Sequence, residues 1–157
     1  MLASAQFIEQ WSYERLTSEA DVILIVRPTA IKKTNVSEAV PRTSIGYMVD
    51  GVRKSKPVFA KVNLATCEIL AQLKGEVKSK QITLRYLRVP EGELKGLLAA
   101  AFYSSGPIFV TFDTKKKPRY LVFLKKLKNG QYRSISDQLD PYHGIVKIPK
   151  PAGVIEE

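Results

Sequence analysis

Aliphatic residues gather in short tracts separated by turn residues, a pattern that predicts strands rather than long helices. The clearest tract covers residues 22–26, which are all aliphatic and are bounded by Asp21 and Arg27. Such a run is typical of a buried strand. Further strands are predicted at 58–73, 82–87, 108–112, 120–127 and 132–135, with a last short pairing at 144–148.

Turn residues and changes of periodicity define the connections between these strands. Asn129-Gly130 is the strongest hairpin signal and joins the strands at 120–127 and 132–135. Within 58–73 the parity of the apolar positions changes near Thr66, which predicts a bulge that bends this strand. Residues 32–56 lack periodicity and predict either a long loop or a ragged hairpin, with a turn at Asp50-Gly51.

Two segments show helical spacing. Apolar residues three to five positions apart predict an amphipathic helix over residues 5–18. On that helix we expect Trp11 to pack against the sheet rather than to face a ligand. A weaker apolar stripe predicts a short helix near 94–104.

Together these elements predict a mainly β fold. Five or six short strands, one of them long and bent, suit a closed or partly open barrel of the oligonucleotide- and oligosaccharide-binding (OB) type. The 157 residues are enough for one domain. We expect a single domain over residues 1–157, with the helix at 5–18, the barrel at about 20–148 and a tail at 149–157.

Four segments carry a resemblance to a known family. The sequences EADVILIV at 19–26, ILAQLKG at 69–75, ITLRY at 82–86 and YLVFL at 120–124 resemble strands of the netrin-like barrel. That module is the inhibitory domain of the tissue inhibitors of metalloproteinases, and it has bacterial relatives of unknown role. The inhibitors use an amino-terminal cysteine to chelate metal and further cysteines to staple the barrel, whereas this chain has only Cys67. The resemblance therefore implies the barrel and an exported setting, and not metalloproteinase inhibition.

The net charge of the chain indicates an anionic partner. Lys and Arg number 25 against 15 Asp and Glu, a net charge of +10. Such a charge favours nucleic acid, anionic lipid headgroups, acidic polysaccharide or an acidic protein. No apolar run approaches the roughly 20 residues of a membrane-spanning helix.

Clustered cations are the leading candidates for binding an anionic partner. Tyr120, Phe123 and Tyr132 are interleaved with them. If exposed, these rings would form a stacking platform for single-stranded nucleic acid; if buried, they belong to the core, and the lysines serve to discourage edge-to-edge aggregation. The clustered cations are Arg53, Lys54, Lys56, Lys115, Lys116, Lys117, Arg119, Lys125, Lys126 and Lys128.

Catalytic chemistry has few candidates in this sequence. His143 is the only imidazole, so a His-rich metal site is excluded, and a single cysteine excludes an intramolecular disulfide. Cys67 and His143 form the one conceivable thiol–imidazole pair, but Cys67 falls within a predicted strand, where a buried thiol acts as a small hydrophobe. We therefore expect no catalytic residues, no metal and no cofactor.

These observations predict a non-enzymatic binding domain for a protein or an anionic polymer. The alternative is a nucleic-acid-binding module that uses the basic loops, and an enzyme built on Cys67 and His143 comes third. Ala3-Ser4-Ala5 resembles the end of a secretory signal. We therefore expect a secreted or periplasmic protein, with a cytoplasmic location as the alternative.

Overall fold

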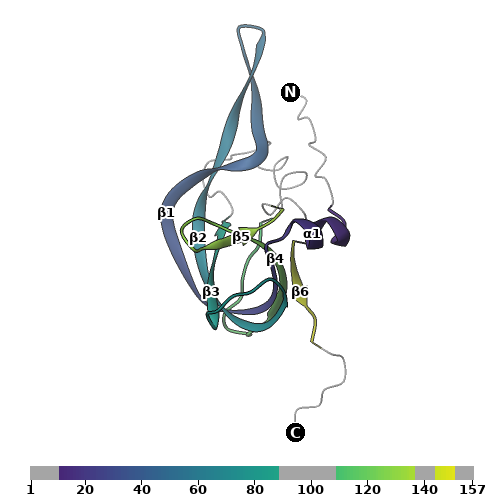
Figure 1. Ribbon diagram of the computed structural model, residues 1–157. Coiled ribbons are helices and arrows are strands. Elements are labelled where there is room, and N and C mark those ends of the chain that lie inside the picture. The colour runs from purple at the N-terminus through teal and green to yellow at the C-terminus, as the bar shows by residue number, and fades with distance from the viewer. Residues whose placement is uncertain (1–10, 89–108, 137–143, 151–157) are drawn as a thin grey trace.

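The computed structural model describes residues 11–88, 109–136 and 144–150 (Figure 1). The predicted helix near 94–104 and His143 lie outside these residues. The described chain is mainly β, as the sequence predicts. Its elements are α1 (Tyr13–Glu19), β1 (Val22–Val49), β2 (Val52–Lys74), β3 (Gln81–Leu87), β4 (Arg119–Lys126), β5 (Tyr132–Ser134) and β6 (Ile145–Ile148).

The amino-terminal helix is shorter than predicted. It begins at Tyr13 because Ser12 adopts an extended conformation and its hydroxyl accepts a hydrogen bond from the Arg15 N–H at 3.2 Å. Trp11 therefore precedes the helix, so a continuous helix over 5–18 is wrong. Trp11 is nevertheless buried, in a cluster that includes Leu16 and Phe123, which confirms its packing role.

Hydrogen bonds connect the strands in the order β1-β2-β3-β5-β4, and β4 pairs again with β1, so the pairings run through five strands and return to the first. We call these five strands the ring. The β3–β5 pairing is parallel and the others are antiparallel. One edge of β4 carries β1, while its other edge carries β6 along the first half and β5 along the last (Figure 1).

Bulges bend the two long strands. Thr29 is an extra residue of β1 opposite Thr66 and Cys67, and its hydroxyl donates to the Thr66 carbonyl at 3.1 Å. The predicted bulge near Thr66 thus has its extra residue in the partner strand. The parity of β2 changes earlier, at Val62 and Asn63, which are both buried. The Asn63 side-chain amide donates to the Tyr86 hydroxyl at 3.3 Å, which satisfies a polar group inside the fold.

One predicted strand is absent. Residues 109–112 form no strand, although the apolar pattern predicts one at 108–112. The apolar side chains of this run are needed for packing and not for pairing with another strand. The Phe112 ring lies between Tyr86 and Tyr120, edge-on to each with centroids 5.0 Å apart.

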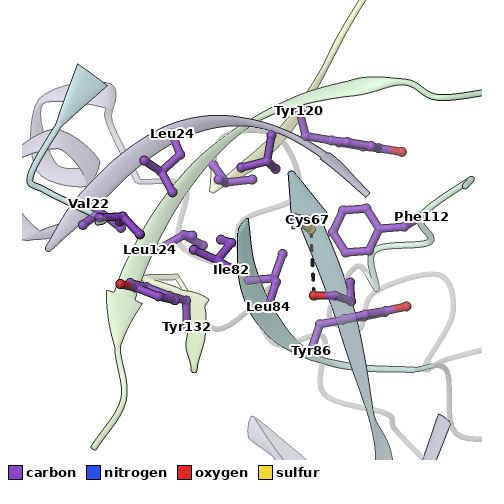
Figure 2. Close-up of a cluster of buried hydrophobic side chains, with 14 residues drawn as sticks. Val22, Leu24, Cys67, Ile82, Leu84, Tyr86, Phe112, Tyr120, Leu124 and Tyr132 are labelled. Carbon is purple, nitrogen blue, oxygen red and sulfur yellow. Dashed lines mark hydrogen bonds between the residues drawn. The ribbon is translucent and has the colours of Figure 1, made fainter. Parts of the chain in front are cut away.

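The main core lies between the strands of the ring. Val22 and Leu24 of β1, Ile82 and Leu84 of β3, and Leu124 of β4 converge on it (Figure 2). A second cluster packs α1 against β1 and β4. A third is formed by Val40, Val58, Ala60, Val62 and Leu87 at the side of the ring from which β1 and β2 continue.

Beyond β3, the strands β1 and β2 continue as a two-stranded arm over residues 37–61, which projects away from the ring (Figure 1). The arm ends in the pair Val49 and Val52, joined by Asp50 and Gly51 with φ of 50° and 75°. Positive φ at both positions is typical of a type I′ hairpin turn. Of the two predictions for residues 32–56, the ragged hairpin is therefore correct and the long loop is wrong.

Candidate binding face along β3

The predicted cationic residues lie in three separate places. Lys115–Lys117 form the turn before β4 together with Arg119 at its start, and Lys125, Lys126 and Lys128 lie at its other end. A strand of this length spans roughly 23 Å, so these two clusters do not share one compact surface. Arg53, Lys54 and Lys56 lie near the tip of the arm.

The turn before β4 is organised by Asp113. Its carboxylate accepts hydrogen bonds from the backbone N–H groups of Lys115 and Lys116, at 2.8 and 3.2 Å. Bonds from the N–H groups of Lys116 and then Lys115 lower the pKa of the Asp113 carboxyl. Lys117 continues the turn with φ of 48°. The lysines are therefore displayed on an ordered turn.

The aromatic residues between the clusters belong to the core. Tyr120, Phe123 and Tyr132 are all buried, with at most 5% of each side chain exposed. Burial raises the pKa of the Tyr120 hydroxyl. These three rings are thus core residues and form no stacking platform.

A different set of residues forms the most structured polar surface, on the outward side of β3. Buried and more exposed residues alternate along this strand, so that Gln81, Thr83 and Arg85 point away from the core. Leu84 pairs with Tyr132 of β5, which places Arg85 beside Arg133 on the same outward side. Arg133 in turn pairs directly with Lys125 of β4. We call Arg85, Arg133 and Lys125 the cationic row.

Two hollows flank this outward side of β3, and together with the cationic row they make up what we call the β3 face. One hollow of about 400 Å³ lies toward the arm and is lined by Glu38, Pro41, Phe59, Arg85 and Arg133, among others. The other, of about 670 Å³, lies between the β2–β3 and β4–β5 connections. It is lined by Thr66, Glu76, Lys78, Ser79, Gln81, Thr83, Lys126 and Gly130, among others.

An ion pair connects the β3 face to the arm. Both terminal nitrogens of Arg85 donate to the two carboxylate oxygens of Glu38, in the paired geometry that suits guanidinium and carboxylate. Glu38 supplies one negative charge against the three positive charges of the cationic row. The same contact joins the base of the arm to β3.

Cys67 has the environment of a core residue. It is fully buried in the main core, and burial raises the pKa of its thiol from 9.0 to about 12. A thiol with that pKa stays protonated near neutral pH and is a poor nucleophile. Its proposed partner His143 lies outside the described residues. Within residues 11–88, 109–136 and 144–150, no group of three or more His, Cys, Asp or Glu side chains could hold a metal ion.

Glu38, Arg85 and Arg133 are not among the binding residues predicted from the sequence. The signal was present, because polar residues at 81, 83 and 85 alternate with apolar residues at 82, 84 and 86. What the pattern could not supply is the parallel pairing of β3 with β5, which brings Arg85 and Arg133 together across 48 positions of sequence.

Neither a protein-family model nor a curated protein matches this sequence. Among the described residues, the structure holds no helix with the length and apolar character needed to cross a bilayer. Any functional conclusion therefore depends on the geometry of the chain itself.

Proposed function

We propose that the protein is a non-enzymatic binding domain on an OB-like barrel, and that its β3 face binds an acidic protein segment or an anionic polymer. The barrel is supported by pairings that run through five strands back to β1, with a core between them. OB-type barrels bind ligands on the face of their second and third strands. The netrin-like kinship and an exported setting remain part of this proposal, on the sequence resemblance alone.

The cationic row is the observation that carries the proposal. Three cations from three neighbouring strands, Arg85, Arg133 and Lys125, lie side by side on the outward side of the sheet. The hollows on either side give the face a concave outline, which an extended chain can follow. Since strands rather than loops position these side chains, the site is held rigidly.

The test is binding of two polyanions, polyglutamate and dextran sulfate, to the full chain and to a Lys125→Gln/Arg133→Gln variant. We expect the variant to bind about tenfold more weakly, since two exposed charge pairs at roughly 0.7 kcal/mol each add up to about 1.4 kcal/mol. The matched control is Lys147→Gln/Lys150→Gln, which removes the same charge from two exposed positions outside the β3 face. Equal weakening by both variants, or no polyanion binding by the full chain, would contradict the proposal.

A second candidate is a module that binds nucleic acid. It is favoured by two basic clusters that flank connections, Arg53, Lys54 and Lys56 just after the β1–β2 turn and Lys125, Lys126 and Lys128 at the β4–β5 connection, since these two loops flank the ligand in OB-type barrels. Binding of single-stranded DNA should then fall steeply with salt, and replacing Lys125, Lys126 and Lys128 with Ala should reduce that slope, as should replacing the basic turn Lys115, Lys116, Lys117 and Arg119 if it also contacts the strand. Salt-insensitive binding, or none, would exclude this candidate.

A further inference from the structure

Exposed apolar side chains gather at the tip of the arm. Met48 and Val52 are 62% and 59% exposed, and Tyr47 and Val49 are each 37% exposed. All four belong to the last three residue pairs before the turn. Because a contiguous group of exposed apolar side chains is unusual on a soluble surface, it marks a site of interaction.

Cations lie directly behind this apolar tip. Lys54 and Lys56 follow Val52 along β2, at roughly 7 and 13 Å from it for a strand that rises about 3.3 Å per residue. Arg53 is paired with Met48, and its guanidinium lies beside Gly46, where an added Cβ would be 3.6 Å from the Arg53 Nε. Gly46 is nearer the ring than Met48, so the Arg53 charge also sits behind the tip.

From this order of apolar and basic groups we propose that the arm is a membrane-docking element, whose tip inserts into the interfacial layer of a bilayer rich in anionic lipid. Interfacial segments bury their apolar side chains about 5–10 Å deep. At that depth Arg53, Lys54 and Lys56 reach the level of the lipid phosphates, which attract basic residues. Asp50 at the turn keeps the tip at headgroup depth, where its carboxylate stays hydrated.

Two other occupants fit the tip less well. A second copy of the chain would bring another charge of +10 against the same basic residues, and such self-repulsion opposes association. Nucleic acid would satisfy the cations but would leave the four apolar side chains in water, unless they were wedged between bases. An anionic bilayer offers an apolar environment to the four exposed side chains and negative charge to the basic residues behind them.

The test is flotation of the full chain with phosphatidylcholine vesicles that either contain or lack phosphatidylglycerol. We expect binding only to the anionic vesicles. Arg53→Gln/Lys54→Gln/Lys56→Gln should weaken it roughly 100-fold, since each basic residue contributes about fivefold at an anionic surface. Met48→Ser/Val52→Ser should weaken it at least about tenfold, because it removes the inserted apolar surface. All five positions are exposed, so the variants should fold, which circular dichroism checks.

The matched control is Lys80→Gln/Lys147→Gln/Lys150→Gln, which removes three exposed charges outside the arm and should keep binding within about twofold of the full chain. A Met48→Trp variant reports insertion, because its fluorescence should shift to shorter wavelength with anionic vesicles only. The proposal fails if the full chain does not bind these vesicles, if the control weakens binding as much as the arm variant, or if the Met48→Ser/Val52→Ser variant binds unchanged. It also fails if the arm variants lose affinity for duplex DNA and not for vesicles.

Discussion

At the residue scale, the backbone of Gly75 lies so close to β1 that there is no room for a side chain. Its φ is +74°, and an added Cβ would lie 2.5 Å from the Asp21 carbonyl oxygen and 2.8 Å from Val22 Cγ1. We expect Gly75→Ala to lower the free energy of unfolding by at least about 3 kcal/mol, from backbone strain together with a clash against β1. Urea denaturation measures this change.

Gly130 provides the control for that experiment, because its φ is +83° but an added Cβ would have nothing within 4 Å. Gly130→Ala should therefore cost only the left-handed conformation, about 1–2 kcal/mol. Equal losses for the two variants would show that the close approach at Gly75 does not matter.

Cys67 links burial to pH dependence. An unfolded chain releases the thiol proton near its ordinary pKa of 9.0, whereas the native state keeps it until about pH 12. The native state thus binds more protons between these values, so this group lowers the free energy of unfolding as pH rises through the window. We expect the stability advantage of the wild type over Cys67→Ala to shrink by up to about 1.4 kcal/mol per pH unit above about pH 9.

Urea denaturation of both proteins between about pH 8 and about pH 10.5 measures this effect. Burial also raises the pKa values of Tyr86 and Tyr120, and because both residues are present in both proteins, the effect of burial on them cancels in the difference; what remains includes the repulsion between an ionised Cys67 and these two hydroxyls. A difference that stays constant with pH would mean that the thiol ionises freely in the native state.

At the element scale, the arm and the ring should differ in local stability. The arm has two strands, with the third apolar cluster and the Glu38–Arg85 ion pair at its base, whereas each strand of the ring has neighbours on both edges. We expect Val58→Ala, which truncates a buried side chain of that cluster, to speed amide hydrogen exchange in the arm and to leave exchange at 22–26 and 82–86 nearly unchanged.

The exchange experiment has two further readouts. The truncation should cost roughly 1–2 kcal/mol locally. Uniformly faster exchange over the whole chain would instead indicate that the arm and the ring unfold together. The exposed Val36 offers a control, since Val36→Ala should change exchange in neither part.

Most of these elements could be predicted from sequence, because the pattern of apolar positions that indicates a strand lies within the strand itself. The tract at 22–26 and the turns at Asp50-Gly51 and Asn129-Gly130 each carry a local signal, and each lies where predicted. The predicted strand at 108–112 is wrong because a run of apolar residues indicates burial and not pairing. Phe112 is buried, but its backbone pairs with no strand. The predicted helix start is wrong because the apolar spacing continues through Trp11, whereas Ser12 caps the amino terminus of the helix, which begins at Tyr13.

The β3 face could not be predicted for a different reason. Its geometry depends on which strands become neighbours, and the β3–β5 pairing joins segments that are far apart in sequence. Clusters of lysine are visible in a sequence, whereas the cationic row takes one residue from each of three strands. The netrin-like kinship has no such geometric test and stays a prediction.

At the scale of the whole molecule, the net charge of +10 should act in opposite directions on stability and on binding. Lys and Arg outnumber Asp and Glu by 25 to 15, so cations stay in excess even where ion pairs such as Arg27–Glu68 at 3.5 Å form. Repulsion among these cations lowers the stability of the folded state, and it is screened as the Debye length falls from about 30 Å at 10 mM salt to about 8 Å at 150 mM. The same screening weakens every contact with an anionic partner.

Sodium chloride over that range should therefore raise the free energy of unfolding, by roughly 0.5–1 kcal/mol, while it weakens binding to polyglutamate or to anionic vesicles. The variant Lys80→Gln/Lys147→Gln/Lys150→Gln, which removes three of the charges behind +10, should gain less stability from salt than the wild type does. Urea denaturation of the wild type and of the variant at each salt concentration measures the two free energies of unfolding. If salt instead lowered stability, attraction between neighbouring opposite charges would outweigh repulsion among the excess cations in the native fold.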